Sequence, residues 1–250
     1  MNAPDRPTAL ITGASRGIGA AVARRLASTH DLILGGRDEQ LLAALRDELA
    51  AAGPLRAELL PVELTDDAAL AEAVSGIDRL DALVHSAGIG ELGTVEETPA
   101  ATWRRQFDVN VVAVAELTRL LLPALRGAGA DTGADVVLVN SGSGITARAG
   151  WGSYAASKFA LRAFGDALRA EEAGHGIRVT SVHPGRVDTD MQQRVVAHER
   201  SAGGASIGLS GGEYDGSRFL RPESVAAAVQ AALTTTPDAH LTEIVLRPRG

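Results

Sequence analysis

Short apolar segments alternate along the chain with segments of helical spacing, and this alternation constrains the fold most. The strand-like segments are Ala9–Thr12, Leu32–Leu34, Leu59–Val62, Ala82–His85, Val136–Val139, Val179–Val182 and Ile244–Leu246. The helical segments are Ile18–Ala27, Glu39–Ala52, Asp66–Val74, 101–126, 153–173 and 222–234. Such alternation is typical of an α/β fold whose parallel sheet has helices on both faces. No linker-like stretch divides the 250 residues, so residues 1–250 are predicted to form a single domain.

A glycine-rich loop, Thr12-Gly13-Ala14-Ser15-Arg16-Gly17-Ile18-Gly19, joins the first predicted strand to the first predicted helix. Glycines permit a tight turn and a close approach of the backbone, and a helix N-terminus offers free N–H groups to a pyrophosphate. The alternative is a flexible turn without a ligand, but the flanking strand and helix favour dinucleotide binding. The candidate contact residues in this loop are Gly13, Ser15, Arg16, Gly17, Ile18 and Gly19.

The end of the second predicted strand indicates which dinucleotide would bind. An acidic residue there would bind the adenosine ribose hydroxyls and repel a 2′-phosphate. This chain has Gly35-Gly36-Arg37 instead, and Arg37 with Arg16 could hold that phosphate through charge-assisted hydrogen bonds. NADP(H) is therefore predicted over NAD(H). Asp38 and Glu39 are assigned to capping the next helix, and the alternative for Arg37 is a solvated side chain.

Tyr154 and Lys158 lie four positions apart in a predicted helix, and Lys158 is the only lysine in the chain. Side chains at this spacing share one helix face. A phenol has a reference pKa of about 10 and exchanges protons poorly at neutral pH unless a nearby cation stabilises the phenolate. Lys158 could be that cation. On spacing alone, an ordinary amphipathic helix turn is the favoured explanation, because such pairs often arise by chance.

Composition and charge exclude several classes of function. The chain has no cysteine, which excludes disulfides, thiolate metal sites and a cysteine nucleophile. The net charge is −7 without a basic patch, which argues against nucleic-acid binding. Met1–Pro7 lacks an apolar signal core, and Val109–Leu125 is interrupted by polar residues and short for a membrane span. We therefore expect a cytoplasmic protein without a metal, nucleic-acid or membrane partner.

Together, Thr12–Gly19 and Tyr154-x-x-x-Lys158 resemble the short-chain dehydrogenase/reductase family in its single-domain form, and the resemblance runs nearly end to end. Ser141, thirteen residues before Tyr154, matches the family's catalytic serine, and Asn110 matches its catalytic asparagine. The resemblance implies a Rossmann-type doubly wound sheet of seven parallel strands. It also implies cofactor contacts from Glu63, Leu64, Ala87, Gly88, Tyr154, Lys158, Pro184, Gly185, Val187 and Thr189.

The resemblance further implies an NADPH-dependent oxidoreductase, a carbonyl reductase or alcohol dehydrogenase, that acts on a small ketone, aldehyde or secondary alcohol. In this mechanism Tyr154 exchanges a proton with the substrate oxygen. Lys158 lowers the pKa of the phenol and binds the nicotinamide ribose. Ser141 donates a hydrogen bond to the carbonyl oxygen, and Asn110 positions a water behind Lys158.

Two positions depart from the family pattern. The usual Asn-Asn-Ala-Gly reads His85-Ser86-Ala87-Gly88, which puts local stability in doubt, and Glu63 replaces an aspartate. Taken one at a time, Ser141 could be a turn residue, Asn110 could hold a helix break and Thr189 could cap a helix. His85 and His183 are interpreted as structural residues at strand ends.

Two further functions remain as alternatives. A catalytically inactive dinucleotide sensor or scaffold would share this fold, but such a protein would be expected to lose Tyr154 or Lys158. A methyltransferase on a similar sheet would need neither residue.

Residues 190–221 are predicted to form a substrate loop or lid with little secondary structure. Within it, the glycine-rich tract Ser201–Gly212 is expected to be mobile, and Tyr214 is expected to contact the substrate. The apolar helical segments containing Leu117–Leu122 and Phe159–Leu168 are expected to form subunit contacts in a homodimer or homotetramer, as the resemblance implies.

Overall fold

Seven parallel strands form one sheet in the computed structural model, which describes residues 6–53, 55–201, 209–210 and 213–249. The strands are β1 (Thr8–Thr12), β2 (Asp31–Gly36), β3 (Ala57–Pro61), β4 (Ala82–His85), β5 (Ala134–Val139), β6 (Ile177–Pro184) and β9 (Glu243–Leu246). Their order is β3-β2-β1-β4-β5-β6-β9. From β1 the chain moves outward to β3 and then returns to place β4 on the other side of β1. This reversal confirms the predicted Rossmann-type doubly wound fold.

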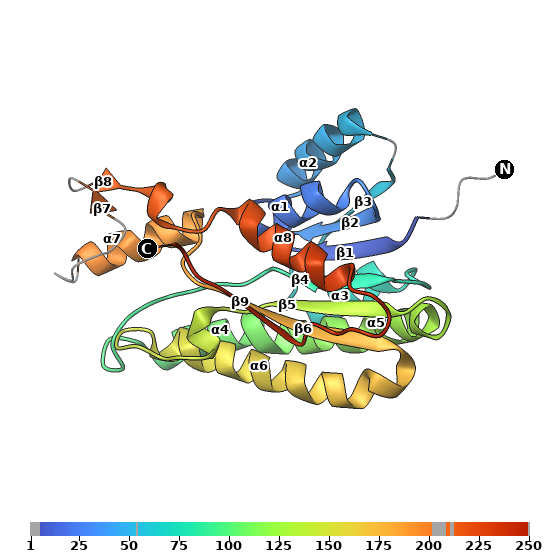
Figure 1. Ribbon diagram of the computed structural model, residues 1–250. Helices are drawn as coiled ribbons and strands as arrows, with labels where there is room; N and C mark the ends of the chain where they lie inside the picture. The colour runs from blue at the N-terminus through green and yellow to red at the C-terminus, as the bar shows by residue number, and fades with distance from the viewer. Residues whose placement is uncertain (1–5, 54, 202–208, 211–212, 250) are drawn as a thin grey trace.

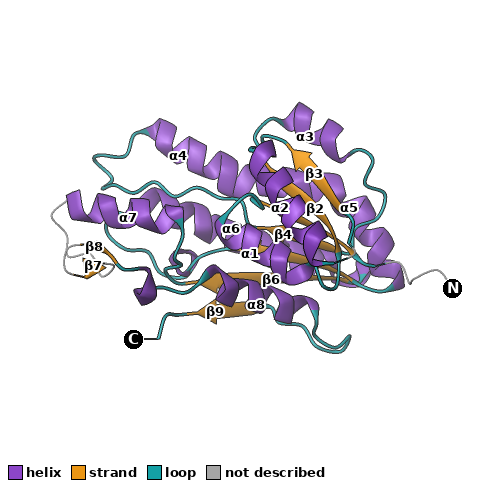
Figure 2. Cartoon of the chain, turned by 90° about the horizontal axis from the view of Figure 1, so that it is seen from above, coloured by secondary structure: helices purple, strands orange, loops and turns teal. Residues whose placement is uncertain are grey.

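Helices cover both faces of the sheet. They are α1 (Gly17–Leu26), α2 (Glu39–Ala52), α3 (Asp67–Val74), α4 (Ala100–Phe107), α5 (Ala113–Asp131), α6 (Gly152–Glu172), α7 (Asp190–Ser201) and α8 (Pro222–Leu233). In Figure 1, α1, α2 and α8 lie above the sheet, and α4, α5 and α6 lie below it. Seen from above in Figure 2, α7 stands apart from these layers, toward the end of the molecule where the C-terminus lies. No helix in the described ranges combines the length and apolarity needed to span a membrane.

The two helical layers explain why the central strands read as uninterrupted apolar runs. Side chains alternate between the faces of a strand. In β5, Val137 and Val139 pack into the core beneath α1, α2 and α8, whereas Val136 and Leu138 pack into the core formed with α3, α5 and α6. Each face is covered, so the four positions from Val136 to Val139 all carry apolar side chains.

The segment predicted as one helix over 101–126 is divided in the structure. A π-helical turn, Asp108–Val112, separates α4 from α5. Within that turn, the Asn110 side chain accepts a hydrogen bond from the Ile89 N–H and donates one to the Ile89 carbonyl, both at 2.9 Å. An inserted turn of this kind re-aims a side chain and is frequent at functional sites. Here it directs Asn110 into the fully buried position that these two bonds require.

The prediction of a loop from Asp190 onward is wrong for its first part, which forms α7. Thr189 begins this helix, because its side-chain oxygen accepts a hydrogen bond from the Gln192 N–H at 3.3 Å. Thr189-x-x-Gln192 has the spacing of a capping box, a signal in the sequence that predicts this helix. Further along, β7 (Leu209–Ser210) and β8 (Glu213–Tyr214) form an antiparallel pair. Most of the tract that was expected to be mobile, 202–208 and 211–212, lies outside the described residues.

The helices predicted to form subunit contacts have both core-facing and exposed side chains. Leu117 and Leu121 are 0% and 1% exposed because they pack into the core between α5 and the sheet, so they are not available to a second subunit. Phe159 and Val112 are 41% and 52% exposed. Assembly into a dimer or tetramer stays a prediction.

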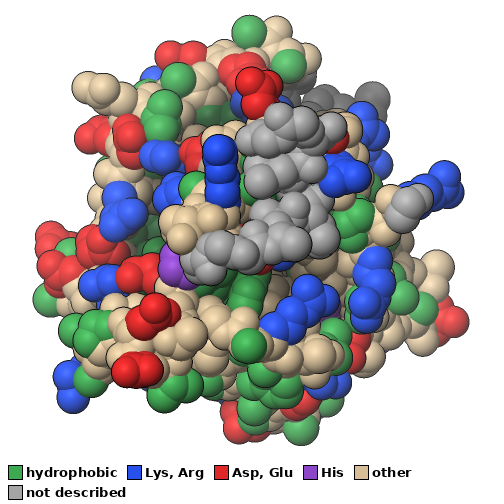
Figure 3. Space-filling model, turned by 90° about the vertical axis from the view of Figure 1, so that its left-hand side faces the viewer, with side chains coloured by type: hydrophobic (Ala, Val, Ile, Leu, Met, Phe, Trp, Pro, Cys, Tyr) green, Lys and Arg blue, Asp and Glu red, His purple; other side chains and the backbone are tan. Residues whose placement is uncertain are grey.

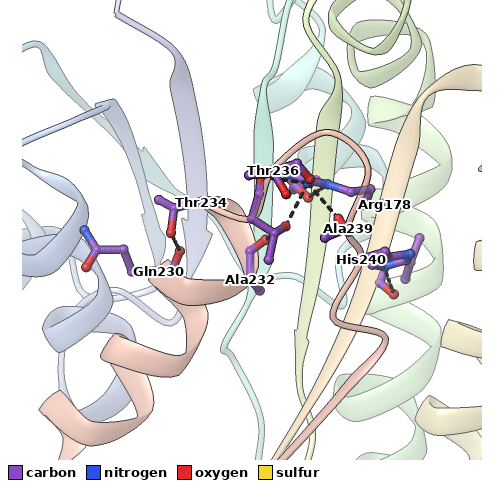
Figure 4. A network of polar contacts seen from close by, with 10 residues as sticks. Arg178, Gln230, Ala232, Thr234, Thr236, Ala239 and His240 are labelled. Atoms are coloured by element: carbon purple, nitrogen blue, oxygen red, sulfur yellow. Dashed lines mark hydrogen bonds and ion pairs between the residues drawn. The ribbon is translucent and has the colours of Figure 1, made fainter.

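A polar cluster at the amino ends of β5 and β6 fixes the loop between α8 and β9 to the sheet (Figure 4). Arg178 donates two hydrogen bonds to the Asp135 carboxylate, both at 2.9 Å. Its remaining nitrogen donates to the Thr235 hydroxyl at 2.8 Å and to the Ala239 carbonyl at 3.3 Å. His240 in the same loop contacts the carbonyl of Val179. Arg178 therefore joins three parts of the fold that are distant in the sequence.

Replacing Arg178 with alanine is expected to lower the free energy of unfolding by about 2 kcal/mol. The reason is that Asp135, only 8% exposed, would lose the guanidinium that compensates its burial. Urea denaturation followed by circular dichroism measures the change. Arg46→Ala is the matched control, because Arg46 pairs with Asp47 at the surface and should contribute less than about 0.5 kcal/mol. Equal losses in the two variants would contradict a structural role for the cluster.

Candidate active site

A cavity of about 290 Å³ opens at the carboxyl ends of the parallel strands. Ligands bind at this end of doubly wound sheets, where the strand order reverses. Side chains from the end of β5, the start of α6, the end of β6, the first turns of α7 and the segment after β9 line the cavity. They include Ser141, Tyr154, Pro184, Gly185, Val187 and Thr189, all predicted from the sequence to lie at the site.

Tyr154 lies on the wall of this cavity and is 8% exposed. A Cβ atom on Gly90 would stand 3.4 Å from its ring, so the loop after β4 passes beside the phenol. Burial raises the pKa of Tyr154, and a hydrogen bond with the Ser141 side chain partly offsets that rise. The expected lowering of this pKa by Lys158 is not found here, because burial outweighs every other influence on the phenol.

Lys158 stands one helical turn after Tyr154 and is 4% exposed. Its ammonium donates a hydrogen bond to the carbonyl of Val139 at 3.2 Å. Because burial disfavours the charged form, the pKa of Lys158 is lowered to about 8. A Cβ atom on Gly88 would lie 3.6 Å from this ammonium and 3.1 Å from the Asn110 Oδ1 atom. Gly88, Asn110 and Lys158 are therefore neighbours, as their assignment to one site requires.

Asn110 connects the loop after β4 to α6. Besides its two bonds to Ile89, its amide donates a hydrogen bond to the Ser157 hydroxyl at 3.0 Å. This arrangement agrees with the alternative that Asn110 holds a helix break, and it places the residue beside the catalytic candidates. The water proposed behind Lys158 stays a prediction.

Ser141 follows the end of β5 by two residues and begins a short 3₁₀ turn, Gly142–Gly144. Its hydroxyl oxygen accepts a hydrogen bond from the Ser143 N–H at 3.1 Å. Its backbone carbonyl accepts one from His183 Nδ1, also at 3.1 Å. His183 is fully buried, and burial lowers its pKa, so a neutral imidazole fixes the backbone beneath Ser141. This position agrees with the interpretation of His183 as a structural residue.

The glycine loop has the shape of a phosphate cradle. Gly13 has φ of 67°, and a Cβ atom there would meet the Ala87 backbone at 2.9 Å. A Cβ atom on Gly19 would stand 2.2 Å from the Gly13 carbonyl oxygen. No side chain caps the N-terminus of α1, which leaves the first N–H groups of the helix for an anionic ligand. The same turn also contains Ser15, Arg16, Gly17 and Ile18. Because its backbone is close-packed and its helix N-terminus is uncapped, the loop fits a dinucleotide pyrophosphate.

Arg37 and Arg16 lie at the surface beyond β2, each near carboxylates. Arg37 forms an ion pair with Glu63 at 3.3 Å, and Arg16 lies 4.0 Å from Asp38 and 3.5 Å from Asp190. Asp38 also caps α2 by accepting a hydrogen bond from the Leu41 N–H, as predicted. Both arginines are exposed and could exchange these partners for a phosphate. Leu64 is buried beside this region.

His85, which replaces an expected asparagine, has a hydrogen-bond partner. It is 2% exposed, and its Nε2 atom lies 2.9 Å from the Thr118 hydroxyl. That hydroxyl donates its proton to the Val114 carbonyl at 2.7 Å, so it accepts from His85. Burial lowers the pKa of His85 to about 3, which keeps the ring neutral. The His85 part of the departure from the family pattern is thus satisfied locally, whereas the Ser86 hydroxyl is buried without a hydrogen-bond partner among the described residues.

The structure adds residues to the cavity that sequence reasoning missed. The additions include Trp151, Met191, Gln192, Arg148, Arg186 and Arg247. Tyr214 is not among the described lining residues, because its hydroxyl donates to Asp188 at 2.8 Å and its ring packs on Phe219. In the part of the chain that is described, no group of three or more His, Asp or Glu side chains could hold a metal ion.

The family model for short chain dehydrogenases matches residues 7–200, a span that contains the glycine loop and the Ser141, Tyr154 and Lys158 group. The chain belongs to the short-chain dehydrogenase family. The predicted resemblance is therefore confirmed, and the chain is an oxidoreductase of this family.

Curated short-chain dehydrogenase relatives cover almost the whole chain. Sulfoacetaldehyde reductase of Chromohalobacter salexigens is 31% identical over 95% of this chain and 92% of its own length. Glycine betaine reductase ATRR of Emericella nidulans is 33% identical over 96% of this chain. The chain spans only 18% of that protein's length.

Solved structures in the family have the same fold. An alcohol dehydrogenase from Thermococcus sibiricus, complexed with 5-hydroxy-NADP, is 25% identical and superposes with a TM-score of 0.82 over 98% of this chain and 97% of its own. Carveol dehydrogenase from Mycobacterium avium, in complex with NAD, is 23% identical, with a TM-score of 0.84 over 97% of this chain and 96% of its own. The second likeness concerns the fold alone.

Proposed function

We propose that this protein is an NADPH-dependent carbonyl reductase, or in the reverse direction an alcohol dehydrogenase, for a small ketone, aldehyde or secondary alcohol. One observation carries the proposal. Tyr154 and Ser141 meet on the wall of a cavity that is large enough for a small substrate, with Lys158 buried one helical turn behind the tyrosine. A nicotinamide bound beside them would supply the hydride.

The side chains can perform the proton chemistry of this reaction. Burial keeps the Tyr154 phenol protonated at neutral pH, so it can donate a proton to a substrate oxygen. Ser141 contacts the same phenol and would donate a hydrogen bond to the oxygen as negative charge develops there. In oxidation the two residues act in reverse, with Tyr154 accepting the proton.

Lys158 and Asn110 would support this proton donor. With a pKa of about 8, Lys158 is mostly charged at neutral pH and would stabilise the phenolate that remains after proton transfer. Its ammonium would also bind the nicotinamide ribose. Gly88 lies beside both Lys158 and Asn110, and we place near these residues the water that returns the proton from solvent.

NADP(H) is the proposed cofactor, and two observations support it. No acidic residue stands at the end of β2, where Gly36 is followed by the exposed Arg37. The Thermococcus alcohol dehydrogenase carries a NADP derivative. Glu63 is paired with Arg37 and would share this guanidinium with a 2′-phosphate.

Arg37→Asp is expected to raise the KM for NADPH by roughly tenfold or more and to change the KM for NADH much less. The new carboxylate would repel the 2′-phosphate and would also face Glu63. Initial rates at varied cofactor concentration measure both constants. Arg46→Asp is the control, because Arg46 lies on α2 and pairs with Asp47. Equal use of the two cofactors by the unmodified enzyme would refute the preference.

A panel of ketones and aldehydes, assayed by the loss of NADPH absorbance, tests the proposed function. Turnover of at least one carbonyl that Tyr154→Phe abolishes would support it. Cofactor binding without turnover of any member of the panel would favour the alternative, a catalytically inactive dinucleotide sensor on the same fold.

A further inference from the structure

The charged side chains that line the cavity are all positive among the described residues. Three arginines line it, Arg148, Arg186 and Arg247, and no aspartate or glutamate stands among its described lining residues. The chain as a whole has the opposite bias, with 31 acidic and 24 basic side chains. Figure 3 shows the end of the molecule onto which the strands lead, where basic and acidic side chains are both exposed, so the positive bias belongs to the cavity lining. A positive cavity in an acidic protein favours a negatively charged ligand.

The three arginines stand around one part of the cavity. A Cβ atom on Gly185 would lie 3.8 Å from the Cα atom of Arg247, so the segment after β9 passes beside the residue that precedes Arg186. The Arg186 guanidinium lies 5.9 Å from the centre of the Trp151 ring. Trp151 in turn closes a backbone turn with Arg148, since its N–H donates to the Arg148 carbonyl at 3.1 Å. The three side chains therefore belong to neighbouring segments.

Two of these arginines have no acidic partner. Arg186 forms a two-point ion pair with Glu199, which offsets its charge. By contrast, neither Arg148 nor Arg247 forms an ion pair or a side-chain hydrogen bond with any described residue. Elsewhere on the surface arginines are commonly paired, as in Arg24–Glu48 and Arg105–Glu91. The positive charge at Arg148 and Arg247 is thus available to a ligand.

Gln192 provides an independent sign of a polar ligand in the same cavity. It lines the cavity from the first turn of α7 and is only 6% exposed. Its side-chain nitrogen has no hydrogen-bond partner in the described structure. A buried donor without a partner costs free energy, and a ligand oxygen would satisfy it.

We propose that the substrate is a carbonyl compound that also carries an oxyanion, bound by Arg148 and Arg247 with Gln192 as a neutral donor. This proposal names the substrate class of the site and rests on the proposed reductase function. Guanidinium groups bind carboxylate, sulfonate and phosphate oxygens in paired hydrogen bonds. The apolar walls contributed by Ile145, Met191 and Val195 would hold the carbon chain between the anion and the carbonyl. Anchored in this way, the substrate would be oriented with its carbonyl toward Tyr154.

Matched acids and esters test the substrate class. The probes are 4-oxopentanoate, 5-oxohexanoate and 6-oxoheptanoate, each with its methyl ester, which keeps the ketone and removes the charge. With NADPH, kcat/KM for the best acid should exceed that for its ester by roughly tenfold or more. The acid-to-ester ratio should fall by about the same factor in an Arg148→Gln/Arg247→Gln variant and stay unchanged in Arg46→Gln. Esters reduced as well as acids by the unmodified enzyme would overturn the proposal and leave the reductase function intact.

Binding to the complex with NADP⁺ separates the two proposals, because no reduction can occur there. Isothermal titration calorimetry should show the acid binding more tightly than its ester, with weaker binding of the acid at high salt. Acid binding together with no turnover of any carbonyl would support the anion site and count against the reductase function. Absence of acid binding, or equal affinity for acid and ester, would overturn the anion site.

The same titration identifies the oxyanion. Butanoate, propane-1-sulfonate and propyl phosphate are added to the NADP⁺ complex as competitors of the best oxo acid. The anion that displaces it at the lowest concentration indicates which group the arginines accept. Failure of all three to displace it would contradict the assignment to Arg148 and Arg247.

Discussion

Tyr154→Phe is expected to lower kcat/KM for carbonyl reduction by roughly 10²–10⁴-fold while NADPH still binds. The substitution removes the phenol hydroxyl that contacts Ser141 and keeps the ring that packs against Trp151. The buried Tyr154 phenol has a raised pKa, so its hydroxyl is protonated at neutral pH. The substitution therefore removes a group that is ready to donate a proton. Initial rates of NADPH oxidation measure kcat/KM, and a fluorescence titration measures the affinity for NADPH.

Turnover within a few-fold of the unmodified enzyme would mean that another group donates the proton. His183 is the one histidine among the described residues that line the cavity. It is a poor candidate, because its Nδ1 proton is directed to the Ser141 carbonyl and burial lowers its pKa. A His183→Gln substitution in the Tyr154→Phe background would identify such a substitute donor by removing the residual rate.

Lys158→Met is expected to reduce kcat/KM by roughly 10²-fold or more and to make the cofactor-free protein more stable at pH 7. The activity falls because no cation remains to stabilise the Tyr154 phenolate. Stability rises because a lysine with a pKa of about 8 in the folded protein, against 10.5 for the ordinary side chain, is buried at an energetic cost. Methionine fills a similar volume without that cost.

The pH dependence of this difference has a definite sign. Below pH 8 the lysine is protonated in both states, and the folded protein bears the full cost, on the order of 3 kcal/mol. Between pH 8 and 10.5 the unfolded chain binds more protons than the folded one, so the stability of the unmodified protein rises with pH. The advantage of Lys158→Met in urea denaturation should therefore be largest at pH 7 and shrink toward pH 10. A constant difference would show that the ammonium carries no burial cost.

Local sequence patterns predicted the sheet well because each strand satisfies a local rule. Val136–Val139 reads as a strand since both of its faces are covered by helices, and this pattern is visible in four residues. The glycine loop was likewise predictable, because the close approach of Gly13 to Ala87 tolerates no side chain. Helical spacing and the family resemblance were enough to predict Tyr154 and Lys158 as candidate site residues.

Features that depend on contacts between distant segments were not predictable in the same way. The π turn at Asn110 exists because its side chain bonds to Ile89, a pairing that no local period encodes. Arg148, Arg186 and Arg247 come from three separate loops and share a cavity only after the sheet has formed. The helix α7 differs, since Thr189 and Gln192 do carry a local capping signal. The helix was difficult to predict in spite of this signal, because the residues that follow it include few apolar ones.

Because lysine is scarce in this chain, Lys158 can be labelled chemically without modification of any other side-chain amine. Lys158 is the only lysine in the sequence, so an acylating or reductively methylating reagent has one side-chain amine to modify. Its lowered pKa increases the unprotonated, nucleophilic fraction near neutral pH, while its burial makes the reaction depend on access through the active site. One mass increment on the peptide containing Lys158 would thus report when that amine becomes reachable. The α-amino group reacts with the same reagents, but it lies on a different peptide, so the modification of Lys158 can be followed separately.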